Sequence, residues 1–202
     1  LPIYKDFFIR FKDFWSNGEP TQADLDKIYV RKEKPYVEVQ FADGSKEKLW
    51  STFSDQQIDI NCQRSETAKK FMRDNLEFLA EHGAALIRLD AFAYATKKEG
   101  TNCFFVEPDV WNLLEECREV LEGHQAEILP EIHEHYFIEK KLEQRGYYTY
   151  DFQLPMLLLN AFFYGKTLYL KNWLNICPRR QFTTLDTHDG IGVVDVRYLM
   201  PD

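Results

Sequence analysis

The sequence predicts an α/β fold in which strands and helices alternate around a parallel sheet. Apolar runs with the length of buried strands occur at residues 84–90, 126–131, 148–152 and 182–186, and helical periodicity separates them. Every run ends in a group of polar residues, as barrel strands do at active sites. We therefore expect part of a (β/α)8 barrel, with about four βα units in this chain. A doubly wound open sheet is the alternative, but no G-x-G-x-x-G sequence follows the first strand.

Residues 1–63 lack this alternation and predict a small α+β insertion domain at the N-terminal end of the chain. Residues 36–41 alternate like a strand, an Asp-Gly pair at 43–44 is typical of a hairpin turn, and residues 48–50 supply a partner strand. We therefore divide the chain into an insertion segment at 1–63 and a barrel segment at 64–202. Since four units cannot close a barrel, we expect this to be the central part of a longer enzyme.

Helix signals lie between the predicted strands. Ser65 is suited to cap a helix whose apolar residues recur every three or four positions, and Gly83 is placed to end it. Pro108 is suited to open a second helix. Two more helices are predicted, over residues 136–145 and from Pro155 onward.

The composition indicates a soluble, cytoplasmic protein. The net charge of −8 disfavours nucleic-acid binding, because neutralising phosphates requires a basic surface. No apolar run reaches the ~18 residues that span a bilayer, and the N-terminus has no secretory signal pattern. The four cysteines have no C-x-x-C spacing, so we expect reduced thiols; a secreted disulfide framework is the alternative.

Two residues at the end of the first predicted strand are candidates for catalysis. Arg88 and Asp90 lie two positions apart, so their side chains share one face of the strand. A guanidinium favours the ionised form of a neighbouring carboxyl group, and a persistent anion suits a nucleophile or an electrostatic stabiliser. An ordinary Arg–Asp ion pair that holds the sheet is the alternative interpretation.

The second predicted strand ends in Glu131 and His133, which share a face for the same reason. Because Glu131 follows Pro130 in an apolar run, we expect burial to raise its pKa. A carboxyl group kept protonated near neutrality suits the general acid that a glycosidic bond requires. A solvated glutamate at a strand end is one alternative. Zinc binding by His133 and His135 is another, although no third ligand has a suitable spacing.

The fourth predicted strand leads into residues 186–190, which crowd Asp186, His188 and Asp189 together. Crowded like charges are costly unless a polar ligand or a cation-like transition state offsets them, and a glycosyl transition state carries such charge. Three carboxylates at neighbouring strand ends therefore predict glycoside chemistry. Adjacent strands lie about 4.8 Å apart, which suits the separation of about 5–5.5 Å between the two carboxyl groups of a retaining enzyme.

Four segments resemble the ordered signature regions of the α-amylase superfamily. They are Gln57–Asn61, Arg88–Ala91, Glu127–His133 and Leu185–Asp189. Within that superfamily, three longer stretches resemble the sucrose phosphorylases: Trp50–Phe53, Leu86–Thr101 and Thr184–Val196. The resemblance covers nearly the whole chain, although the first signature region and the last barrel strand of the family fall outside it.

The resemblance implies a role for individual residues. Asp90 is implied to be the nucleophile, Glu131 the acid/base and Asp189 the transition-state stabiliser. The residues implied to contact the sugars or the nucleophile are Arg88, His188, His133, Tyr94, Phe53 and Gln57. Arg31 lies in a basic run where the family has a phosphate-binding arginine; a solvated loop charge is the alternative.

The resemblance also implies the reaction. A retaining enzyme would transfer a glucosyl unit from sucrose to phosphate and release fructose and α-glucose 1-phosphate, without a cofactor or a metal. The alternatives are a phosphorylase of sucrose 6′-phosphate or glucosylglycerate, an α-glucosidase-type hydrolase and, from another class, a noncatalytic sugar-binding domain. We expect no nucleic-acid or membrane partner, and a homodimer is among the expected assemblies. Because half of the barrel is missing, we expect the isolated 202-residue chain to be inactive.

Overall fold

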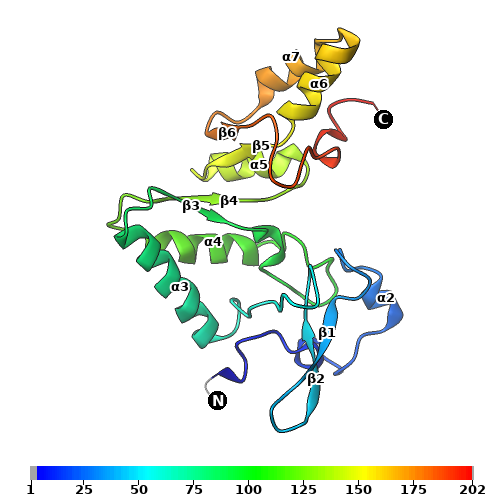
Figure 1. The fold of residues 1–202 in the computed structure, drawn as a ribbon, viewed down its shortest axis with the longest axis vertical. Helices are drawn as coiled ribbons and strands as arrows, with labels where there is room; N and C mark the ends of the chain where they lie inside the picture. The colour runs from blue at the N-terminus through cyan, green and yellow to red at the C-terminus, as the bar shows by residue number, and fades with distance from the viewer. Residues whose placement is uncertain (1–3, 202) are drawn as a thin grey trace. The chain divides into compact units, whose positions relative to one another are not determined.

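The computed structural model describes residues 4–201, which fall into two compact units (Figure 1). Unit 1 comprises the described part of Leu1–Ala84 together with Phe92–Gln125. Unit 2 comprises Ala85–Ala91 together with the described part of Ala126–Asp202. The chain therefore enters unit 2 twice. The predicted boundary between an insertion segment and a barrel segment after residue 63 stays a prediction.

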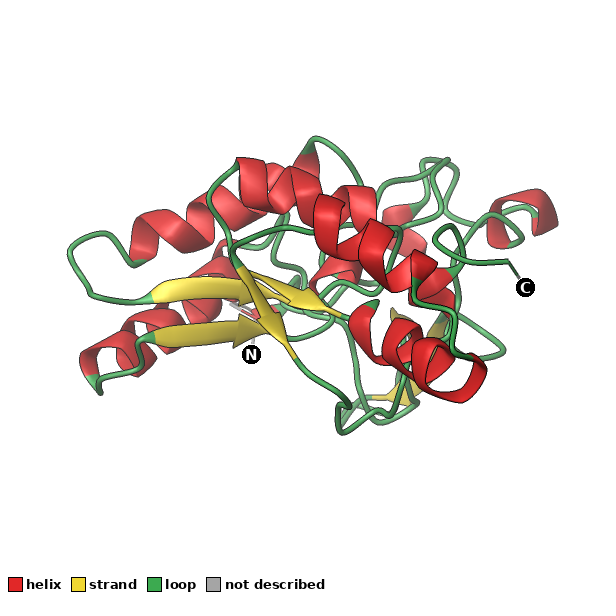
Figure 2. Ribbon diagram, turned by 90° about the horizontal axis from the view of Figure 1, so that it is seen from above, coloured by secondary structure: helices red, strands yellow, loops and turns green. Residues whose placement is uncertain are grey.

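Strands and helices alternate along the chain from the middle of unit 1 to the end of unit 2. The elements of unit 1 are α1 (Phe11–Phe14), α2 (Gln22–Leu25), β1 (Tyr36–Gln40), β2 (Lys46–Trp50), α3 (Glu66–Glu81), the short 3₁₀ helix η2 (Phe92–Tyr94) and α4 (Asp109–Val120). Those of unit 2 are β3 (Leu86–Leu89), β4 (Glu127–Pro130), α5 (Tyr136–Gln144), β5 (Thr149–Asp151), α6 (Leu154–Tyr164), α7 (Leu168–Ile176), β6 (Gln181–Thr183) and the 3₁₀ helix η3 (Val194–Val196). Loops connect these helices and strands (Figure 2).

The predicted hairpin in unit 1 is confirmed, since β1 pairs with β2 in antiparallel register. Gly44 adopts a φ of 83° in the turn, a conformation that glycine reaches without steric cost. Asp43 Oδ1 accepts a hydrogen bond from the backbone N–H of Ser45 at 2.9 Å, which closes the turn locally. The buried core cluster of this unit is largely aromatic: Ile9, Phe11, Phe14, Trp15, Ile28, Trp50 and Cys103.

The predicted helix signals are also confirmed in unit 1. Ser65 Oγ accepts a hydrogen bond from the backbone N–H of Ala68 at 3.2 Å and so caps α3. Pro108 precedes α4, whose buried face packs on α3. Cys117 Sγ lies 3.9 Å from Met72 Sδ where the two helices meet.

The strands of unit 2 are parallel, as the sequence predicts, but they form two separate two-stranded sheets in place of one continuous sheet. β3 pairs with β4, β5 pairs with β6, and β4 contacts β5. The spatial order therefore follows the chain order, which is the arrangement of strands in a barrel wall. The last strand is a correction: it ends at Thr183 and does not extend to Asp186. Thr184 Oγ1 donates a hydrogen bond to the Asp186 carbonyl, so a turn begins where the strand was expected to continue.

The Leu-rich stretch after Pro155 forms two helices, α6 and α7. Gly165 ends α6 in a left-handed conformation with φ of 66°. The two helices pack on each other, and Leu157 and Trp173, which have no exposed surface, lie in their shared core cluster. Within residues 4–201, no helix combines the length and the apolarity needed to cross a membrane. All four cysteines are free thiols.

Candidate active site

The paired strands β3 and β4 bring the first predicted site residues together in unit 2. In their parallel register the two strands end opposite each other, with Asp90 following one and Glu131 the other (Figure 1). Ile87 and Ile128 pair across the strands and are 5% and 3% exposed. Because Ile87 and Ile128 are buried, they anchor β3 and β4, and the strands fix the backbone positions of Asp90 and Glu131 at one edge of the sheet.

One guanidinium joins the two carboxylates. Arg88 Nη1 lies 2.7 Å from Asp90 Oδ1, and Arg88 Nη2 lies 2.5 Å from Glu131 Oε1. Asp90 has 73% of its side chain exposed, whereas Glu131 has 10%. The predicted Arg88–Asp90 contact is thus present, and the same arginine also reaches the second carboxylate.

The backbone of Ala91 completes the surroundings of Glu131. Its N–H donates a hydrogen bond to Glu131 Oε2 at 3.0 Å. Ala91 has a φ of 47°, in the left-handed region that a residue with a Cβ rarely adopts. Such strain persists only where the surrounding structure imposes it, and it is frequent at functional sites. Both oxygens of Glu131 are therefore held by donors.

His133 extends the charged contacts away from the sheet edge. Its Nε2 lies 3.7 Å from Glu131 Oε1, and its Nδ1 lies 3.3 Å from Asp195 Oδ2. The imidazole stacks on the Phe152 ring, with centroids 3.8 Å apart and an angle of 23° between the planes. We refer to the five charged residues joined in this way as the Arg88 network: Arg88, Asp90, Glu131, His133 and Asp195.

The expectation that Glu131 is protonated near neutrality is wrong for this structure. Burial does raise the pKa of Glu131. Hydrogen bonds from His133, the Ala91 N–H and Arg88, together with the charge of Arg88, outweigh burial and lower the pKa to about 2. Glu131 is therefore a carboxylate at neutral pH. An apolar run before position 131 predicts burial, but it does not reveal the donors that converge on the side chain.

His133 carries the proton of the pair that it forms with Glu131. Burial lowers the pKa of His133, but the hydrogen bonds and charges of Asp195 and Glu131 raise it to about 9. The imidazole is therefore positively charged at neutral pH. Two ionisable groups this close titrate as a pair, so the pair holds one proton under those conditions.

His135 does not share a site with His133, which bears on the zinc alternative. His135 Nδ1 accepts a hydrogen bond from the backbone N–H of Phe137 at 3.2 Å and caps α5. Its ring stacks on Tyr136. In the part of the chain that the structure describes, no group of three or more His, Cys, Asp or Glu side chains is arranged to hold a metal ion.

The predicted site residues after β6 lie in an exposed turn. His188 Nε2 lies 3.3 Å from Asp189 Oδ2, and their side chains are 71% and 63% exposed. Thr187 and Gly190 exchange backbone hydrogen bonds that close the turn. Among the residues that the structure describes, the polar contacts of this segment stay within residues 184–190. These contacts do not join Asp189 to Glu131, and its role as a stabiliser stays a prediction.

Two predicted sugar-binding residues lie in an aromatic cluster of unit 1. The rings of Phe53 and Tyr94 meet edge to face with centroids 5.1 Å apart. Tyr94 also packs on Tyr29 and Phe104. Phe53 and Tyr29 are 39% and 44% exposed, so the cluster presents aromatic surface of the kind that sugar rings stack on. Its contact with a sugar stays a prediction.

The polar predicted residues of unit 1 are exposed. Gln57 Oε1 accepts a hydrogen bond from Ser54 Oγ at 3.1 Å. Arg31 is exposed, and its neighbour Lys32 donates to Asp55 Oδ1 at 2.7 Å. The basic run is therefore partly neutralised, while phosphate binding by Arg31 stays a prediction.

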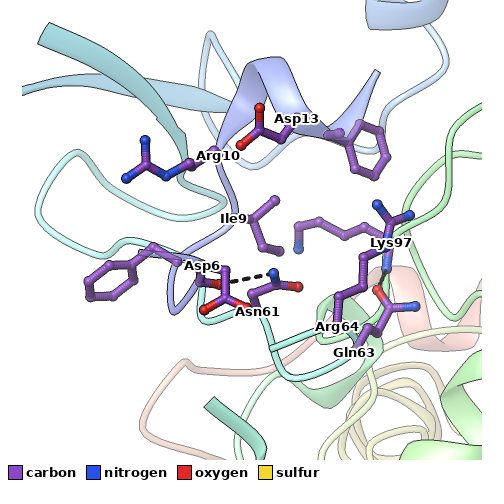
Figure 3. A pocket seen from close by; sticks show the side chains of 10 residues that line it. Asp6, Ile9, Arg10, Asp13, Asn61, Gln63, Arg64 and Lys97 are labelled. Atoms are coloured by element: carbon purple, nitrogen blue, oxygen red, sulfur yellow. Dashed lines mark hydrogen bonds between the residues drawn. The ribbon is translucent and has the colours of Figure 1, made fainter. Parts of the chain in front are cut away.

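A polar cavity of about 110 Å³ in unit 1 contains none of the predicted site residues (Figure 3). Asn61 donates to the Asp6 carbonyl at 3.0 Å, and the Lys97 N–H donates to Gln63 Oε1 at 2.6 Å. Lys97 Nζ pairs with Asp59 at 2.7 Å. The lining combines both charge signs, which gives no preference for an anion or a cation.

Sequence reasoning missed three contributors to the Arg88 network. Asp195, the Ala91 N–H and the Phe152 ring all hold Glu131 or His133. One signal for Asp195 was present, because an aspartate between Val194 and Val196 interrupts an apolar run. Nothing local marks Ala91, since its φ follows from the tertiary structure.

The network has the parts that a double displacement needs. Asp90 is the exposed carboxylate, open to a ligand, and Glu131 is the buried carboxylate beside a protonated imidazole. Glycosyl transfer with retention uses one carboxylate as nucleophile and a second as acid and base. The arrangement is therefore suited to that chemistry.

Comparison with known proteins places the chain among glucoside phosphorylases. It is 52% identical over 200 residues to the sucrose phosphorylase of Streptococcus mutans, covering 98% of this chain and 41% of that protein. It is 44% identical over 200 residues to the glucosylglycerol phosphorylase of Marinobacter adhaerens, again covering 98% of this chain and 41% of the relative. No protein-family model matches the chain.

A solved structure shows the same fold. The crystal structure of sucrose 6F-phosphate phosphorylase from Thermoanaerobacter thermosaccharolyticum matches 98% of this chain and 41% of its own, with a TM-score of 0.92 and 33% identity. Enzymes of this kind are (β/α)8 barrels, so the strand–helix units described here correspond to part of a barrel. The chain spans 41% of the length of each of these three relatives.

Proposed function

This chain is a sucrose phosphorylase-like protein of the α-amylase superfamily, and on that premise we propose that the protein containing it transfers a glucosyl unit from sucrose to phosphate. The products are α-glucose 1-phosphate and fructose. The main support is that Arg88 holds Asp90 and Glu131 together at the ends of neighbouring parallel strands. Retaining glycosyl transfer needs two carboxyl groups at one glycosidic bond.

In the first half of the reaction, Asp90 attacks the anomeric carbon of the glucosyl unit. An ester bond to Asp90 forms while the glycosidic bond to fructose breaks, and the leaving oxygen needs a proton. Glu131 is ionised in the free protein, so it must first gain that proton. His133 Nε2 is the protonated group beside Glu131 Oε1, at 3.7 Å. The proton passes from His133 to Glu131 and then to the fructosyl oxygen.

In the second half, phosphate displaces Asp90 from the anomeric carbon. The ester bond breaks, a bond to a phosphate oxygen forms, and the proton released by hydrogen phosphate returns to the Glu131–His133 pair. Two inversions give net retention, so the product has the α configuration. The choice of phosphate over water is supported by the names of the relatives and not by the geometry of the network.

The remaining assignments rest on the resemblance. Asp189 stabilises the transition state, Arg31 contacts phosphate, and residues 1–63 form an insertion domain of the barrel. The residues that contact the sugars are Arg88, His188, His133, Tyr94, Phe53 and Gln57. We expect the protein to act in the cytoplasm, and a homodimer remains the expected assembly.

A second candidate function is phosphorolysis of glucosylglycerol. It is favoured by the 44% identity to a glucosylglycerol phosphorylase over the same share of this chain. Both reactions use the same glucosyl transfer and differ in the leaving group. Formation of glucose 1-phosphate from sucrose and from glucosylglycerol therefore distinguishes the two functions.

The test supplies full-length protein with phosphate and either sucrose or glucosylglycerol, and measures glucose 1-phosphate. We expect product from sucrose, little glucose when phosphate is omitted, and no product with the Asp90→Asn variant. Product from glucosylglycerol alone would assign the second function. Glucose release that ignores phosphate would indicate a hydrolase, and sucrose binding without any product would indicate a binding protein.

A further inference from the structure

His133 is held on its inner side by a buried carboxylate that the reaction itself does not require. Asp195 Oδ2 lies 3.3 Å from His133 Nδ1, and the Asp195 side chain has no exposed surface. The residue belongs to η3, so it comes from a part of the chain distant in sequence from β4. The opposite ring nitrogen, Nε2, faces Glu131 Oε1.

Gly192 makes this contact sterically feasible. A Cβ at position 192 would lie 1.9 Å from Asp195 Oδ2 and 3.9 Å from His133 Nδ1. The other described glycines have a positive φ, whereas Gly192 does not, so the backbone conformation at position 192 does not require glycine. The absence of a side chain is required by the space that the Asp195 carboxylate occupies.

Other ionisable groups face the same interior. Glu139 of α5 is 2% exposed, and burial raises its pKa well above the usual value. Its Oε1 accepts a hydrogen bond from Gln153 Nε2 at 2.8 Å. Asp151 of β5 accepts from Trp173 Nε1 at 2.9 Å, and burial raises its pKa as well. The charges of Asp151 and Asp195 raise the pKa of Glu139 further and the charge of His133 lowers it, so Glu139 is electrostatically coupled to the His133–Asp195 pair.

Arg88 is a second cation beside Glu131, in addition to His133. Arg88 of β3 pairs with Glu131, and it lies near Tyr150 of β5. Burial raises the pKa of Tyr150, so that phenol is neutral near pH 7. The His133 imidazolium lies between two carboxylates: Glu131 at the sheet edge and Asp195 in the interior.

We propose that Asp195 is a positioning residue that orients His133 through Nδ1, keeps the imidazole protonated, and thereby presents an N–H at Nε2 to Glu131. Gly192 is the position that leaves room for it. The catalytic consequence, delivery of a proton to the leaving group, rests on the proposed function. The orientation and the charge of His133 do not depend on the proposed function.

The test follows the titration of His133 by NMR in full-length protein, with its resonance assigned by its disappearance in His133→Gln. In the parent protein we expect a pKa of about 9. In Asp195→Asn the pKa falls towards the usual 6.5, because the carboxylate that stabilises the imidazolium is gone. Asp74→Asn is the matched control, since it makes the same change at a 55% exposed carboxylate of α3.

Gly192→Ala supplies an independent variant with the Asp195 carboxyl group retained. The added methyl group displaces the carboxylate, so the His133 pKa falls as in Asp195→Asn. An unchanged His133 titration in both variants would overturn the proposal. Failure of both variants to fold would also contradict it, because a positioning role requires the imidazole alone to change.

Kinetics separate this proposal from the proposed function. If the parent protein phosphorolyses sucrose, kcat/KM declines at alkaline pH as His133 loses its proton, and Asp195→Asn moves that decline to lower pH. A decline at the same pH in both proteins would contradict the catalytic part of the proposal. If the parent protein has no phosphorylase activity, the proposed function fails and the NMR titration still decides the role of Asp195.

Discussion

Two groups of predicted site residues differ in how the protein holds them: Arg88, Asp90, Glu131 and His133 of the Arg88 network, and His188 and Asp189 of the turn at residues 184–190. Strand pairing fixes the network at the ends of β3 and β4, and Glu131 has donors on both carboxylate oxygens. The turn lies beyond β6, and His188 and Asp189 are largely exposed. Contacts within this chain therefore fix the geometry of the network, whereas they leave the Asp189 side chain largely exposed, and its predicted catalytic role would require further contacts from substrate or from other parts of the protein.

The largest expected effect is on the nucleophile. Asp90→Asn in the full-length protein replaces the attacking carboxylate with an amide of similar volume. We expect sucrose turnover to fall by at least about 10⁴-fold, while sucrose binding remains measurable by calorimetry. Asp74→Asn should leave turnover unchanged. Retention of a substantial fraction of turnover in Asp90→Asn would mean that another residue carries the glucosyl unit.

The next effect separates proton transfer from structural support at Glu131. Glu131→Gln should slow turnover of sucrose by about 10²–10⁴-fold, because the fructosyl oxygen needs a proton. Glucosyl fluoride needs no proton on its leaving group, so its reaction with the enzyme should be affected far less. The measurement compares the first glucosyl transfer from both donors. Equal losses, with an unchanged circular dichroism spectrum, would contradict the assignment of Glu131.

Asp189→Asn tests the other half of the comparison. If Asp189 stabilises the transition state, turnover falls by about 10²–10³-fold, as for other electrostatic groups of active sites. Because the side chain is 63% exposed, the free energy of unfolding should change by less than about 0.5 kcal/mol. Turnover and denaturant unfolding are measured on the same preparation. A marked loss of stability would show that the turn is packed in the full-length protein.

The smallest effect concerns stability at acid pH. The folded-state pKa of Glu131 is lowered from 4.5 to about 2, so its ionised form stabilises the folded protein above pH 4.5. This contribution is lost progressively as the pH falls from 4.5 towards 2. The unfolding free energy of the parent protein minus that of Glu131→Gln should therefore be constant between pH 4.5 and 6.5, where His133 stays protonated, and decrease below pH 4.5. A difference that does not change through this window would contradict the lowered pKa.

Local signals in the sequence were sufficient for most helices and strands. Ser65 caps α3 and the Asp-Gly pair closes the hairpin because both effects are determined by a few neighbouring residues. The end of β6 was misplaced because Thr184 bonds to the Asp186 carbonyl and closes a turn in a run that looks extended. Periodicity alone does not distinguish these two outcomes.

The contact between Arg88 and Asp90 was predictable from the sequence, whereas the protonation of Glu131 was not. The period of two in a strand correctly placed Arg88 beside Asp90. The charge state of Glu131 depends on Arg88, Ala91 and His133, which converge only after β3 and β4 pair. Asp195 was missed for the same reason, since it lies 62 residues from His133 in the chain.

We expect Asp90 to receive the glucosyl unit within the Arg88 network. The most direct measurement incubates the full-length Glu131→Gln protein with glucosyl fluoride in the absence of phosphate and maps covalent adducts by peptide mass spectrometry. Without the base that activates an acceptor, the intermediate should accumulate, so we predict one added hexosyl unit on the peptide that contains Asp90. A hexosyl unit on a different carboxylate, or no adduct although fluoride is released, would contradict the account.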